Sequence, residues 1–246
     1  MSKFFTNVNS EINLYTRRSI RSPIVTQMIY GDTYSIIIKK SNWWKIKITK
    51  DGYTGFIKKI KSEKLLKTSH KISVLAAHFY KKPNKKIKLG TLTFGSKLKI
   101  DLRNRKFSQF QNMWIENKNL KPIQFKNKDV FSDIKMFNNI KYKWGGKTFK
   151  GLDCSALIQL FLNFNNRFCP RDTSDQVKYF KKNIKLKNIK KNDVIYWRGH
   201  VGVLLSKNKL IHAYGPLKKT ILMDLNISVK RIEKTASLKI IGIKRI

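Results

Sequence analysis

Cys154 is the side chain in this sequence whose context best suits nucleophilic chemistry. It follows Asp153 and opens an apolar run that contains no Pro or Gly and extends to about Asn165. An Asp before such a run is a favourable N-cap, so the pattern predicts a helix over residues 153–165 with the cysteine in its first turn. The helix dipole and the unpaired N–H groups of a first turn favour the thiolate, which is the nucleophilic form of cysteine.

Two histidines further along the chain supply the proton chemistry that a cysteine nucleophile needs. His200 opens the apolar segment HVGVLL, and His212 lies twelve residues later in LIHAYG. A hairpin of that length places two rings side by side. His200 is then the general base and acid, and His212 orients it and stabilises the imidazolium. A Cys–His⁺ pair at a helix terminus predicts a thiol pKa lowered from ~8.5 to roughly 3.5–7.5.

Each of these signals is weak alone, because a lone cysteine is more often a small buried residue and a lone histidine is more often structural. We interpret His70 and His78 in this structural way, and Cys169 as a core residue. The four histidines and two cysteines do not group at metal-ligand spacing. No metal site and no cofactor is therefore expected.

The elements that precede the cysteine read as β-structure. Residues 1–65 alternate β-branched and aromatic runs with turns at Gly31-Asp32 and Asp51-Gly52. Strands are expected at residues 36–38, 44–48 and 53–57. Several short strands at close spacing predict a small barrel. The order GD, strand, WW, strand, DGYTGFI resembles bacterial SH3-like domains, and residues 66–123 are interpreted as a second, degenerate copy.

Residues 124–246 combine helical and strand patterns, unlike the β-rich residues before them. A helix is expected at 129–140, followed by the cysteine helix and a further helix after Pro170. Five short strands then follow, in NDVIYWR, HVGVLLSKN, KLIHAYG, TILMDL and LKIIGIKRI. Helices followed by an antiparallel run of strands predict an α+β domain. A helix that carries Cys, followed by strands that carry His, is one way to build a papain-like site.

Six segments over about residues 135 to 225 together resemble the NlpC/p60 cysteine peptidases: YKWGG, GLDCSALIQL, PRDTSDQ, NDVIYW, HVGVLL and LIHAYG. The resemblance implies Cys154 as nucleophile, His200 as base and His212 as the third residue. Ala156 departs from the pattern, since the family usually has Gly there. Helix propensity tolerates that change.

In the branch of the family with paired SH3-like domains, the resemblance implies a substrate pocket lined by Tyr142, Asp153 and Ser155. The implied reaction is hydrolysis of the γ-D-glutamyl bond to a diamino acid, usually meso-diaminopimelate, in peptidoglycan stem peptides with a free N-terminal L-Ala. A buried carboxylate such as Asp153 would bind the ammonium of that L-Ala by a charge-assisted hydrogen bond, or serve as a helix cap, or both.

The formal net charge of +40, from 54 Lys and Arg against 14 Asp and Glu, attracts anions of every kind. Because the lysines are spread along the whole chain among Ile, Asn and Phe, we favour compositional bias over a nucleic-acid surface and expect no nucleic-acid partner. The first residues show no apolar signal segment, and no stretch is long enough to span a bilayer. A cytoplasmic protein is the resulting expectation.

The sequence therefore favours a cytoplasmic endopeptidase that acts on peptidoglycan-derived peptides, in cell-wall peptide recycling. Two alternatives stay open. One is a secreted hydrolase of intact peptidoglycan, and the other is a catalytically idle protein that uses its positive charge on an anionic polymer. The alternative of a catalytically idle protein requires Cys154 to be unreactive.

Overall fold

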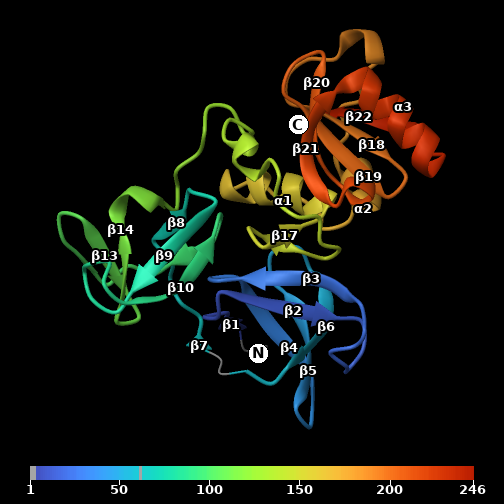
Figure 1. The fold of residues 1–246 in the computed structure, drawn as a ribbon. Coiled ribbons are helices and arrows are strands. Elements are labelled where there is room, and N and C mark those ends of the chain that lie inside the picture. Colours follow the sequence, from blue (N-terminus) through green and yellow to red (C-terminus); the bar gives the residue numbers. More distant parts are fainter. Residues whose placement is uncertain (1–3, 61–62) are drawn as a thin grey trace. The chain divides into compact units, whose positions relative to one another are not determined.

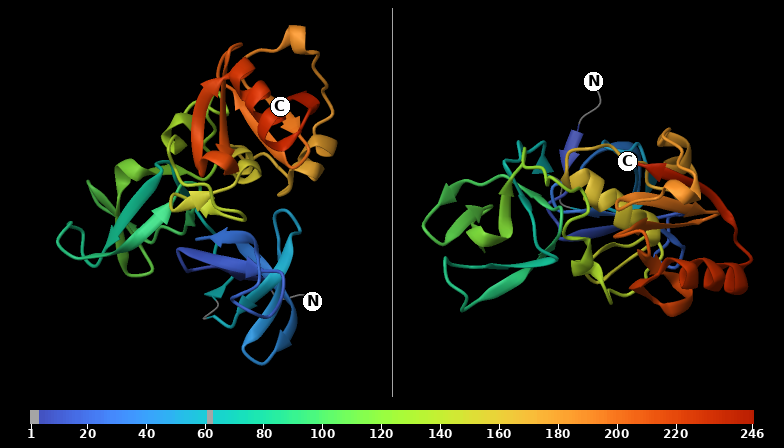
Figure 2. Two further views of the ribbon diagram at one scale, coloured as in Figure 1. Left: turned by 45° about the vertical axis from the view of Figure 1, so that its right-hand side comes forward. Right: turned by 90° about the horizontal axis from the view of Figure 1, so that it is seen from above.

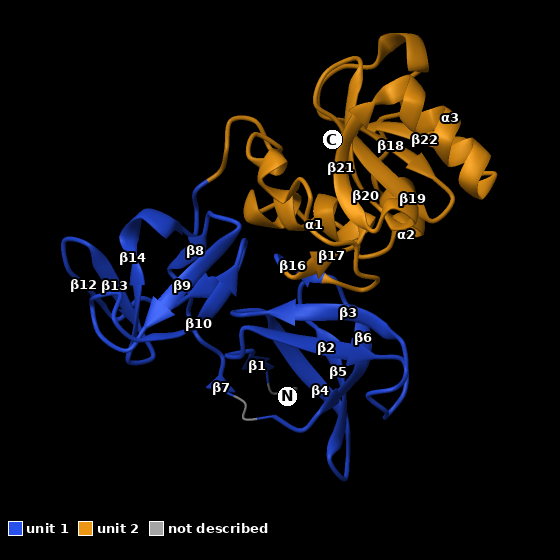
Figure 3. Cartoon of the chain, in the orientation of Figure 1, with its two compact units in different colours: residues 1–125, 147–149 blue, residues 126–146, 150–246 orange. Residues whose placement is uncertain are grey.

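The chain, described from a computed structural model over residues 4–60 and 63–246, forms two compact units (Figure 3). Unit 1 comprises residues 1–125 and 147–149, and unit 2 comprises residues 126–146 and 150–246. The two N-terminal halves, expected as separate barrels, thus lie together in unit 1. Residues 147–149 join them through two buried or partly buried hydrogen bonds, from Lys147 N–H to Gln27 Oε1 (2.8 Å) and from Phe149 N–H to Thr93 Oγ1 (3.1 Å).

The first half of unit 1 is one antiparallel sheet whose described strands run in the order β3-β2-β6-β5-β4-β1-β7 (Figure 1). The strands are β1 (Phe4–Thr6), β2 (Glu11–Tyr15), β3 (Ile24–Ile29), β4 (Thr33–Lys40), β5 (Trp43–Ile48), β6 (Thr54–Lys58) and β7 (Glu63–Lys64). The three strands expected from the sequence correspond to β4, β5 and β6. In β5 alternate residues Trp44, Ile46 and Ile48 are buried, because successive side chains of a strand point to opposite faces.

The second half of unit 1 is also all β. Its strands are β8 (His70–Ile72), β9 (Ala76–Tyr80), β10 (Lys88–Thr93), β11 (Lys97–Leu98), β12 (Leu102–Arg103), β13 (Phe107–Phe110), β14 (Met113–Glu116) and β15 (Leu120–Pro122). They form a sheet β10-β9-β14-β13-β12 and a second sheet β11-β8-β15. The short 3-10 helix η1 (Asn117–Asn119) lies between β14 and β15, and β16 (Lys147–Thr148) completes the unit.

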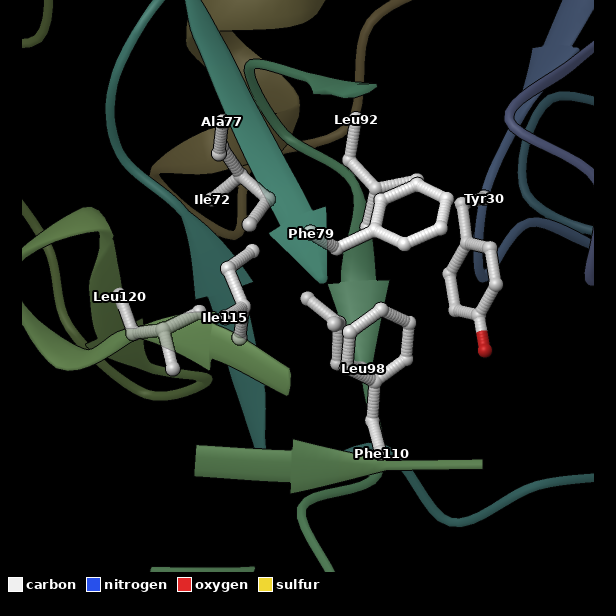
Figure 4. Close-up of a cluster of buried hydrophobic side chains, with 9 residues drawn as sticks. All are labelled: Tyr30, Ile72, Ala77, Phe79, Leu92, Leu98, Phe110, Ile115 and Leu120. Atoms are coloured by element: carbon white, nitrogen blue, oxygen red, sulfur yellow. The ribbon is translucent and has the colours of Figure 1, made fainter. Parts of the chain in front are cut away.

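A buried apolar cluster holds the second half together and reaches into the first (Figure 4). The rings of Phe79 and Phe110 meet edge to face at a centroid distance of 5.7 Å. Tyr30, from the turn after β3, packs edge to face on Phe110 at 5.6 Å, and its hydroxyl donates to Gln111 Oε1. These contacts link the two halves, because Tyr30 of the first half packs into the core of the second, while the first half also has a core of its own.

Unit 2 contains three α-helices and an antiparallel sheet in the order β21-β20-β19-β18-β22 (Figures 1 and 2). The helices are α1 (Cys154–Phe164), α2 (Thr173–Tyr179) and α3 (Leu225–Ala236), and the 3-10 turns are η2 (Ile134–Phe137), η3 (Leu186–Asn188) and η4 (Gly215–Leu217). The strands are β17 (Gly151–Leu152), β18 (Asp193–Trp197), β19 (His200–Leu204), β20 (Lys209–Tyr214), β21 (Lys219–Asp224) and β22 (Ile240–Arg245). The expected order of the cysteine helix, a second helix and an antiparallel sheet is confirmed.

Helix α1 is buried on nearly every side and contacts β19 and β20. It begins at Cys154 after the cap Asp153 and ends at Phe164, as the sequence predicted. An all-round apolar helix of this kind forms because it lies in the core rather than on the surface. It therefore holds its first turn rigidly against the two central strands of the sheet.

Two helical expectations need correction. The helix expected at 129–140 is only the 3-10 turn η2, in which Ile134 and Phe137 are buried. Phe131, just before it, is also buried, so the three apolar residues follow a spacing of three. That spacing matches three residues per turn rather than 3.6. Conversely, α3 was missed, although Asp224 caps it by accepting from the N–H groups of Asn226 and Ile227. Among the described residues, no helix is long and apolar enough to cross a membrane.

Candidate functional site

The cysteine lies where the sequence placed it, at the first position of α1. Asp153 has extended backbone angles and its carboxylate accepts the N–H of Ala156 at 2.9 Å, which is a standard N-cap bond. Cys154 is buried, with 5% of the residue exposed, and it lies at the positive end of a buried helix.

The glycines before the cysteine position this helix start. Gly145 has φ +71°, in the left-handed region that favours glycine, and its N–H donates to Asp153 Oδ2 at 2.9 Å. A Cβ at Gly146 would lie 2.4 Å from the carbonyl oxygen of Gly151, so no larger residue fits there. The segment WGG is therefore required by close backbone approach and by the turn that brings an N–H to the cap carboxylate.

The Asp153 carboxylate is the centre of a buried polar network. Arg171 contacts both of its oxygens, with Nη2 at 2.6 Å from Oδ2 and Nη1 at 3.0 Å from Oδ1. Ser155 Oγ donates to Oδ1 at 3.1 Å and accepts from Arg171 Nη1 at 2.8 Å. The side chains of Arg171 and Asp153 are 2% and 8% exposed. This two-pronged ion pair fixes the first turn of α1 and holds the Ser155 hydroxyl in one place.

The two imidazoles meet across the sheet, as the spacing predicted. Strands β19 and β20 pair antiparallel, and Nε2 of His200 lies 2.8 Å from Nδ1 of His212. Both rings are buried, and the ring of Tyr214 stacks on that of His212 at 4.9 Å. A Cβ at Gly202 would lie 3.0 Å from three carbon atoms of Leu210, so glycine keeps the two strands close at this point.

The sulfur of Cys154 lies against the backbone on either side of His200. The thiol contacts the carbonyl oxygen of Gly199 at 3.9 Å, and the N–H groups of Val201 and Ser155 face the sulfur and favour its ionised form. Gly199, at φ +73°, forms the turn that leads into β19. The structure therefore brings the cysteine sulfur to the backbone that flanks His200, and the ring of His200 is hydrogen-bonded with that of His212.

The charge state of this site differs from the sequence expectation. Burial, together with the nearby charge of Asp153, raises the pKa of the Cys154 thiol to about 12, although the facing N–H groups and Arg171 act in the opposite direction. Burial also lowers the pKa of His200 to about 4. Burial therefore favours the neutral thiol and the neutral imidazole over the predicted thiolate–imidazolium pair, because it penalises both charged forms.

This charge state fixes what His200 must do. A neutral imidazole accepts a proton on the nitrogen that carries a lone pair, and its other nitrogen then carries the hydrogen. If Nδ1 of His200 serves as the base, its Nε2–H donates to His212 Nδ1 and the proton of His212 sits on its Nε2. That nitrogen has no hydrogen-bond partner within the described part of the chain. Burial, together with the nearby His200, lowers the pKa of His212 to about 3, so His212 stays neutral.

Tyr142 lies beside Leu152, the residue that precedes the N-cap Asp153. Its N–H donates to the carbonyl of Lys218, and residues 142 and 152 form a parallel bridge. Burial and the nearby Cys154 and Asp153 raise the pKa of the Tyr142 hydroxyl, so it remains a protonated donor at all physiological pH values. Tyr142, Asp153 and Ser155 therefore all lie around the cysteine.

Sequence reasoning missed Arg171 and Gln176, which support this site. The amide of Gln176 donates to the carbonyls of Ser155 (3.0 Å) and Pro170 (2.9 Å), so α2 is tied to the first turn of α1. Both residues stand within the segment PRDTSDQ. The sequence showed only an arginine just before a helix and a glutamine within it. Their partners in the site, Asp153 and Ser155, lie many residues earlier in the chain, so the contacts could not be predicted.

The other histidines and Cys169, which the sequence interpreted as structural, each make contacts of their own. His78 is exposed and shares a hydrogen bond with Thr91 Oγ1, and His70 is hydrogen-bonded with Ser69 Oγ. Cys169 is 1% exposed and packs inside unit 2. No group of three or more potential ligands gathers as a metal site in the part of the chain that the structure describes.

Comparisons with known proteins point to one family. Residues 139–231 match the model of the NlpC/P60 family. The γ-D-glutamyl-L-lysine dipeptidyl-peptidase of Bacillus subtilis is 26% identical over 214 residues, which is 77% of this chain and 72% of that protein. Dipeptidyl-peptidase 6 of Lysinibacillus sphaericus is 23% identical over 228 residues, 82% of this chain and 84% of that protein.

The fold is shared with solved structures over nearly the whole chain. An NlpC/P60 family protein from Bacillus cereus superposes with a TM-score of 0.84 at 17% identity, covering 98% of this chain and 99% of that one. An NlpC/P60 endopeptidase from Photobacterium damselae subsp. piscicida gives a TM-score of 0.65 at 12% identity, over 98% of this chain and 70% of that one. The cysteine, both histidines and the Arg171 network all fall inside the segment that matches the NlpC/P60 family model.

Proposed function

We propose that this protein is a cysteine peptidase that cuts the γ-D-glutamyl–diamino acid bond of peptidoglycan stem peptides with a free N-terminal L-Ala. The observation that carries the chemistry is the convergence of the buried Cys154 sulfur with the backbone around His200, whose ring is hydrogen-bonded with His212. The bond specificity is supported by the printed name of the Bacillus subtilis relative, which is a γ-D-glutamyl-L-lysine dipeptidyl-peptidase.

The reaction proceeds by acyl transfer. His200 takes the thiol proton as Cys154 Sγ attacks the γ-carbonyl carbon of D-Glu, and the carbonyl electrons move onto oxygen. Collapse of this intermediate breaks the C–N bond, and His200 returns the proton to the leaving amine of the diamino acid. Water, deprotonated by the same imidazole, then hydrolyses the thioester. Because thiol and imidazole are both neutral at rest, proton transfer accompanies attack rather than preceding it.

Tyr142, Asp153 and Ser155 are proposed to line the substrate pocket. The Asp153 carboxylate already accepts hydrogen bonds from Gly145, Ala156, Ser155 and Arg171, and its charge is balanced by that arginine. We therefore propose that Asp153 acts on the substrate through the Ser155 hydroxyl that it fixes, while the Tyr142 hydroxyl donates directly. The Tyr142 contact would strengthen as negative charge develops on the carbonyl oxygen. The Ser155 hydroxyl gives its hydrogen to Asp153, so toward the substrate it would act as an acceptor, for example from the ammonium of L-Ala.

The two N-terminal halves are proposed to be SH3-like barrels, from the close spacing of their short antiparallel strands. We propose that the protein acts in recycling of wall peptides rather than on the intact wall, because Cys154 is buried, with 5% of the residue exposed. A buried nucleophile suits a short free peptide better than a cross-linked polymer.

The test compares four substrates: L-Ala-γ-D-Glu-meso-diaminopimelate, the same tripeptide with L-Lys, its N-acetylated form and intact sacculi. Mass spectrometry of the products identifies the bond that is cut. We expect cleavage after γ-D-Glu in the free tripeptides, slow or absent cleavage of the acetylated form, and loss of all cleavage in Cys154→Ser with an unchanged melting temperature. Sacculi digested as fast as the free tripeptide would overturn the recycling role, and full turnover by Cys154→Ser would remove the proposed nucleophile.

A further inference from the structure

A separate cleft of about 650 Å3 is formed entirely by the second half of unit 1. Its walls are three turns, at residues 83–85, 105–107 and 116–118. The first turn joins β9 to β10, the second joins β12 to β13, and the third follows β14. The volume lies within the range of roughly 300–1,000 Å3 that is usual for sites that bind small molecules or short peptides. None of its residues belongs to the site around Cys154.

The rim of this cleft carries four cationic side chains, Lys85, Arg105, Lys106 and Lys118. All four are exposed. Lys85 and Lys118 pair with Glu116, and Arg105 and Lys106 present their charged ends to a ligand. Positive charge alone is not informative in a chain of net charge +40. What distinguishes this place is that cations from three separate turns converge on one concave surface, where their fields add.

The walls are fixed before any ligand arrives. Asn104 Oδ1 accepts the N–H groups of Lys106 (2.9 Å) and Phe107 (2.7 Å), which locks the second turn. The amide of Asn117 donates to the Asn104 carbonyl at 2.8 Å and its Oδ1 accepts from Ser108 at 2.6 Å. The second and third turns are therefore held together by side chains, and ligand binding needs little ordering of the backbone.

A carboxylate stands among these cations. Glu116 Oε1 lies 2.9 Å from Lys85 Nζ and 3.4 Å from Lys118 Nζ, and the glutamate side chain is 18% exposed. Partial burial acts to raise the Glu116 pKa, but its hydrogen bonds and ion pairs with the two lysines outweigh this and lower it. The charge pattern is thus several cations around one anion. It is complementary to a ligand with several carboxylates and an ammonium group that can meet Glu116, and it opposes a uniformly negative chain of phosphates.

The floor of the cleft also argues against nucleic acid. Phe107 is 7% exposed, and its ring meets Tyr80 edge to face at 6.2 Å, so it offers no face on which a base could stack. The aromatic edge and Pro83 instead provide an apolar surface for the aliphatic part of a peptide.

We propose that this cleft is a second binding site, specific for a short acidic peptide that carries several carboxylates and an ammonium group that can meet Glu116. Under the proposed function, on which this identification of the ligand rests, the stem tripeptide L-Ala-γ-D-Glu-meso-diaminopimelate, with three carboxylates and two ammonium groups, is such a molecule. The cleft would retain substrate or product on the protein independently of the site at Cys154.

The experiment uses the full chain with Cys154→Ala, which prevents hydrolysis, and titrates it with L-Ala-γ-D-Glu-meso-diaminopimelate. Backbone amide shifts in ¹H–¹⁵N spectra report on residues 104–107 and 116–118, and calorimetry gives the affinity. We expect saturable shifts at these turns, which weaken at least about tenfold in Arg105→Gln/Lys106→Gln and weaken as salt is raised. Lys58→Gln/Lys59→Gln removes the same charge from exposed positions in the first half and is expected to leave the cleft shifts unchanged.

Glu116→Gln tests whether the Glu116 carboxylate binds an amino group of the peptide. It is expected to reduce the preference for the free peptide over a peptide acetylated on its amino groups. Absence of shifts at the three turns, or equal losses in the two double variants, would overturn the proposal. So would a thymidine oligonucleotide that displaces the peptide at equal or lower concentration. Hydrolysis by the unaltered protein is measured separately, so cleft binding without hydrolysis would refute the proposed function alone, and hydrolysis without cleft binding would refute this inference alone.

Discussion

Nε2 of His200 lies 2.8 Å from Nδ1 of His212, and both rings are buried in the central strands of unit 2. The two tautomers decide which ring donates in this contact. When His200 Nε2–H is the donor, its lone pair lies on Nδ1, on the opposite side of the ring, and that nitrogen is left to accept a proton. The pair is therefore an oriented base rather than two independent histidines.

The first prediction concerns this orientation. His212→Ala removes the acceptor and is expected to lower kcat for the tripeptide about 10²–10⁴-fold, with a much smaller change in KM, because the wrong tautomer of His200 cannot accept the thiol proton. His212→Gln offers a side-chain oxygen in the same region and is expected to restore part of the loss. Steady-state kinetics with mass detection measures both.

A change in KM without a change in kcat would contradict the positioning role of His212. The exposed His78 provides the matched control, and His78→Ala is expected to leave both constants unchanged. Circular dichroism of each variant separates loss of orientation from loss of fold.

The second prediction concerns the resting charge state of the site. With the thiol pKa raised to about 12 and that of His200 lowered to about 4, the neutral pair persists over the whole range between them. The profile of kcat/KM against pH should therefore keep its acid limb near 4 and show no alkaline loss between about 8 and 9, where an imidazolium paired with a thiolate would deprotonate.

Alkylation gives an independent readout of the same charge state. The rate of iodoacetamide labelling at Cys154 should be low at about pH 6 and rise continuously above about pH 9, because a thiol reacts only through its thiolate. Cys154→Ser supplies the background from Cys169. A rate that is already high and constant across neutral pH would show that the thiolate forms at rest, as the sequence alone had suggested.

The third prediction concerns the buried ion pair between Arg171 and Asp153. Arg171→Met leaves a carboxylate in a site where both partners are nearly inaccessible, and is expected to cost about 3–5 kcal/mol of unfolding free energy. The double change Arg171→Met/Asp153→Asn is expected to recover part of that loss, because no unpaired charge remains. Urea unfolding of the variants measures the difference.

The ion pair between Lys191 and Asp129 is the matched control. Its ammonium and carboxylate are 58% and 25% exposed, so Lys191→Met is expected to cost no more than about 1 kcal/mol. Equal losses for Arg171→Met and Lys191→Met would show that burial does not make the Arg171 pair special.

The fourth prediction concerns stability in acid. The folded state holds His200 and His212 neutral, with pKa values of about 4 and about 3, whereas in the unfolded chain both have the ordinary value near 6.5. The unfolded state therefore binds more protons below about pH 6.5, and stability must fall as pH decreases from there toward the folded values. Each histidine contributes up to about 1.4 kcal/mol per pH unit in that window.

Urea unfolding at a series of pH values tests this linkage. His212→Asn removes one titrating group and should flatten the fall in stability between about pH 6 and 4, whereas His78→Asn should leave it unchanged. An identical slope in the unaltered protein and in His212→Asn would mean that His212 is already protonated in the folded state.

The segment that carries the nucleophile was predictable because its signals are local. Asp153 caps the helix through an N–H only three residues away, and the apolar run from Leu157 onward needs no distant partner to indicate a helix. The hairpin that joins β19 to β20 is local in the same sense, so the contact between the two imidazoles followed from spacing. The cap of α3 at Asp224 was equally local. That helix was missed because the strand patterns on both sides of it, in TILMDL and LKIIGIKRI, were the stronger signals.

The charge state and the support of the site were decided by the tertiary structure. The pKa of Cys154 depends on how much solvent the fold removes around the sulfur, and that burial opposes the helix terminus which the sequence made visible. Arg171 supports the site because it pairs with the carboxylate of Asp153, eighteen residues earlier in the chain. The cleft at residues 83–85, 105–107 and 116–118 forms only when folding brings these three turns together. Short-range hydrogen bonds and apolar periodicity depend on neighbouring residues, so they can be predicted from the sequence. Desolvation of the Cys154 thiol and the convergence of cationic side chains at the cleft depend on segments that only folding brings into contact.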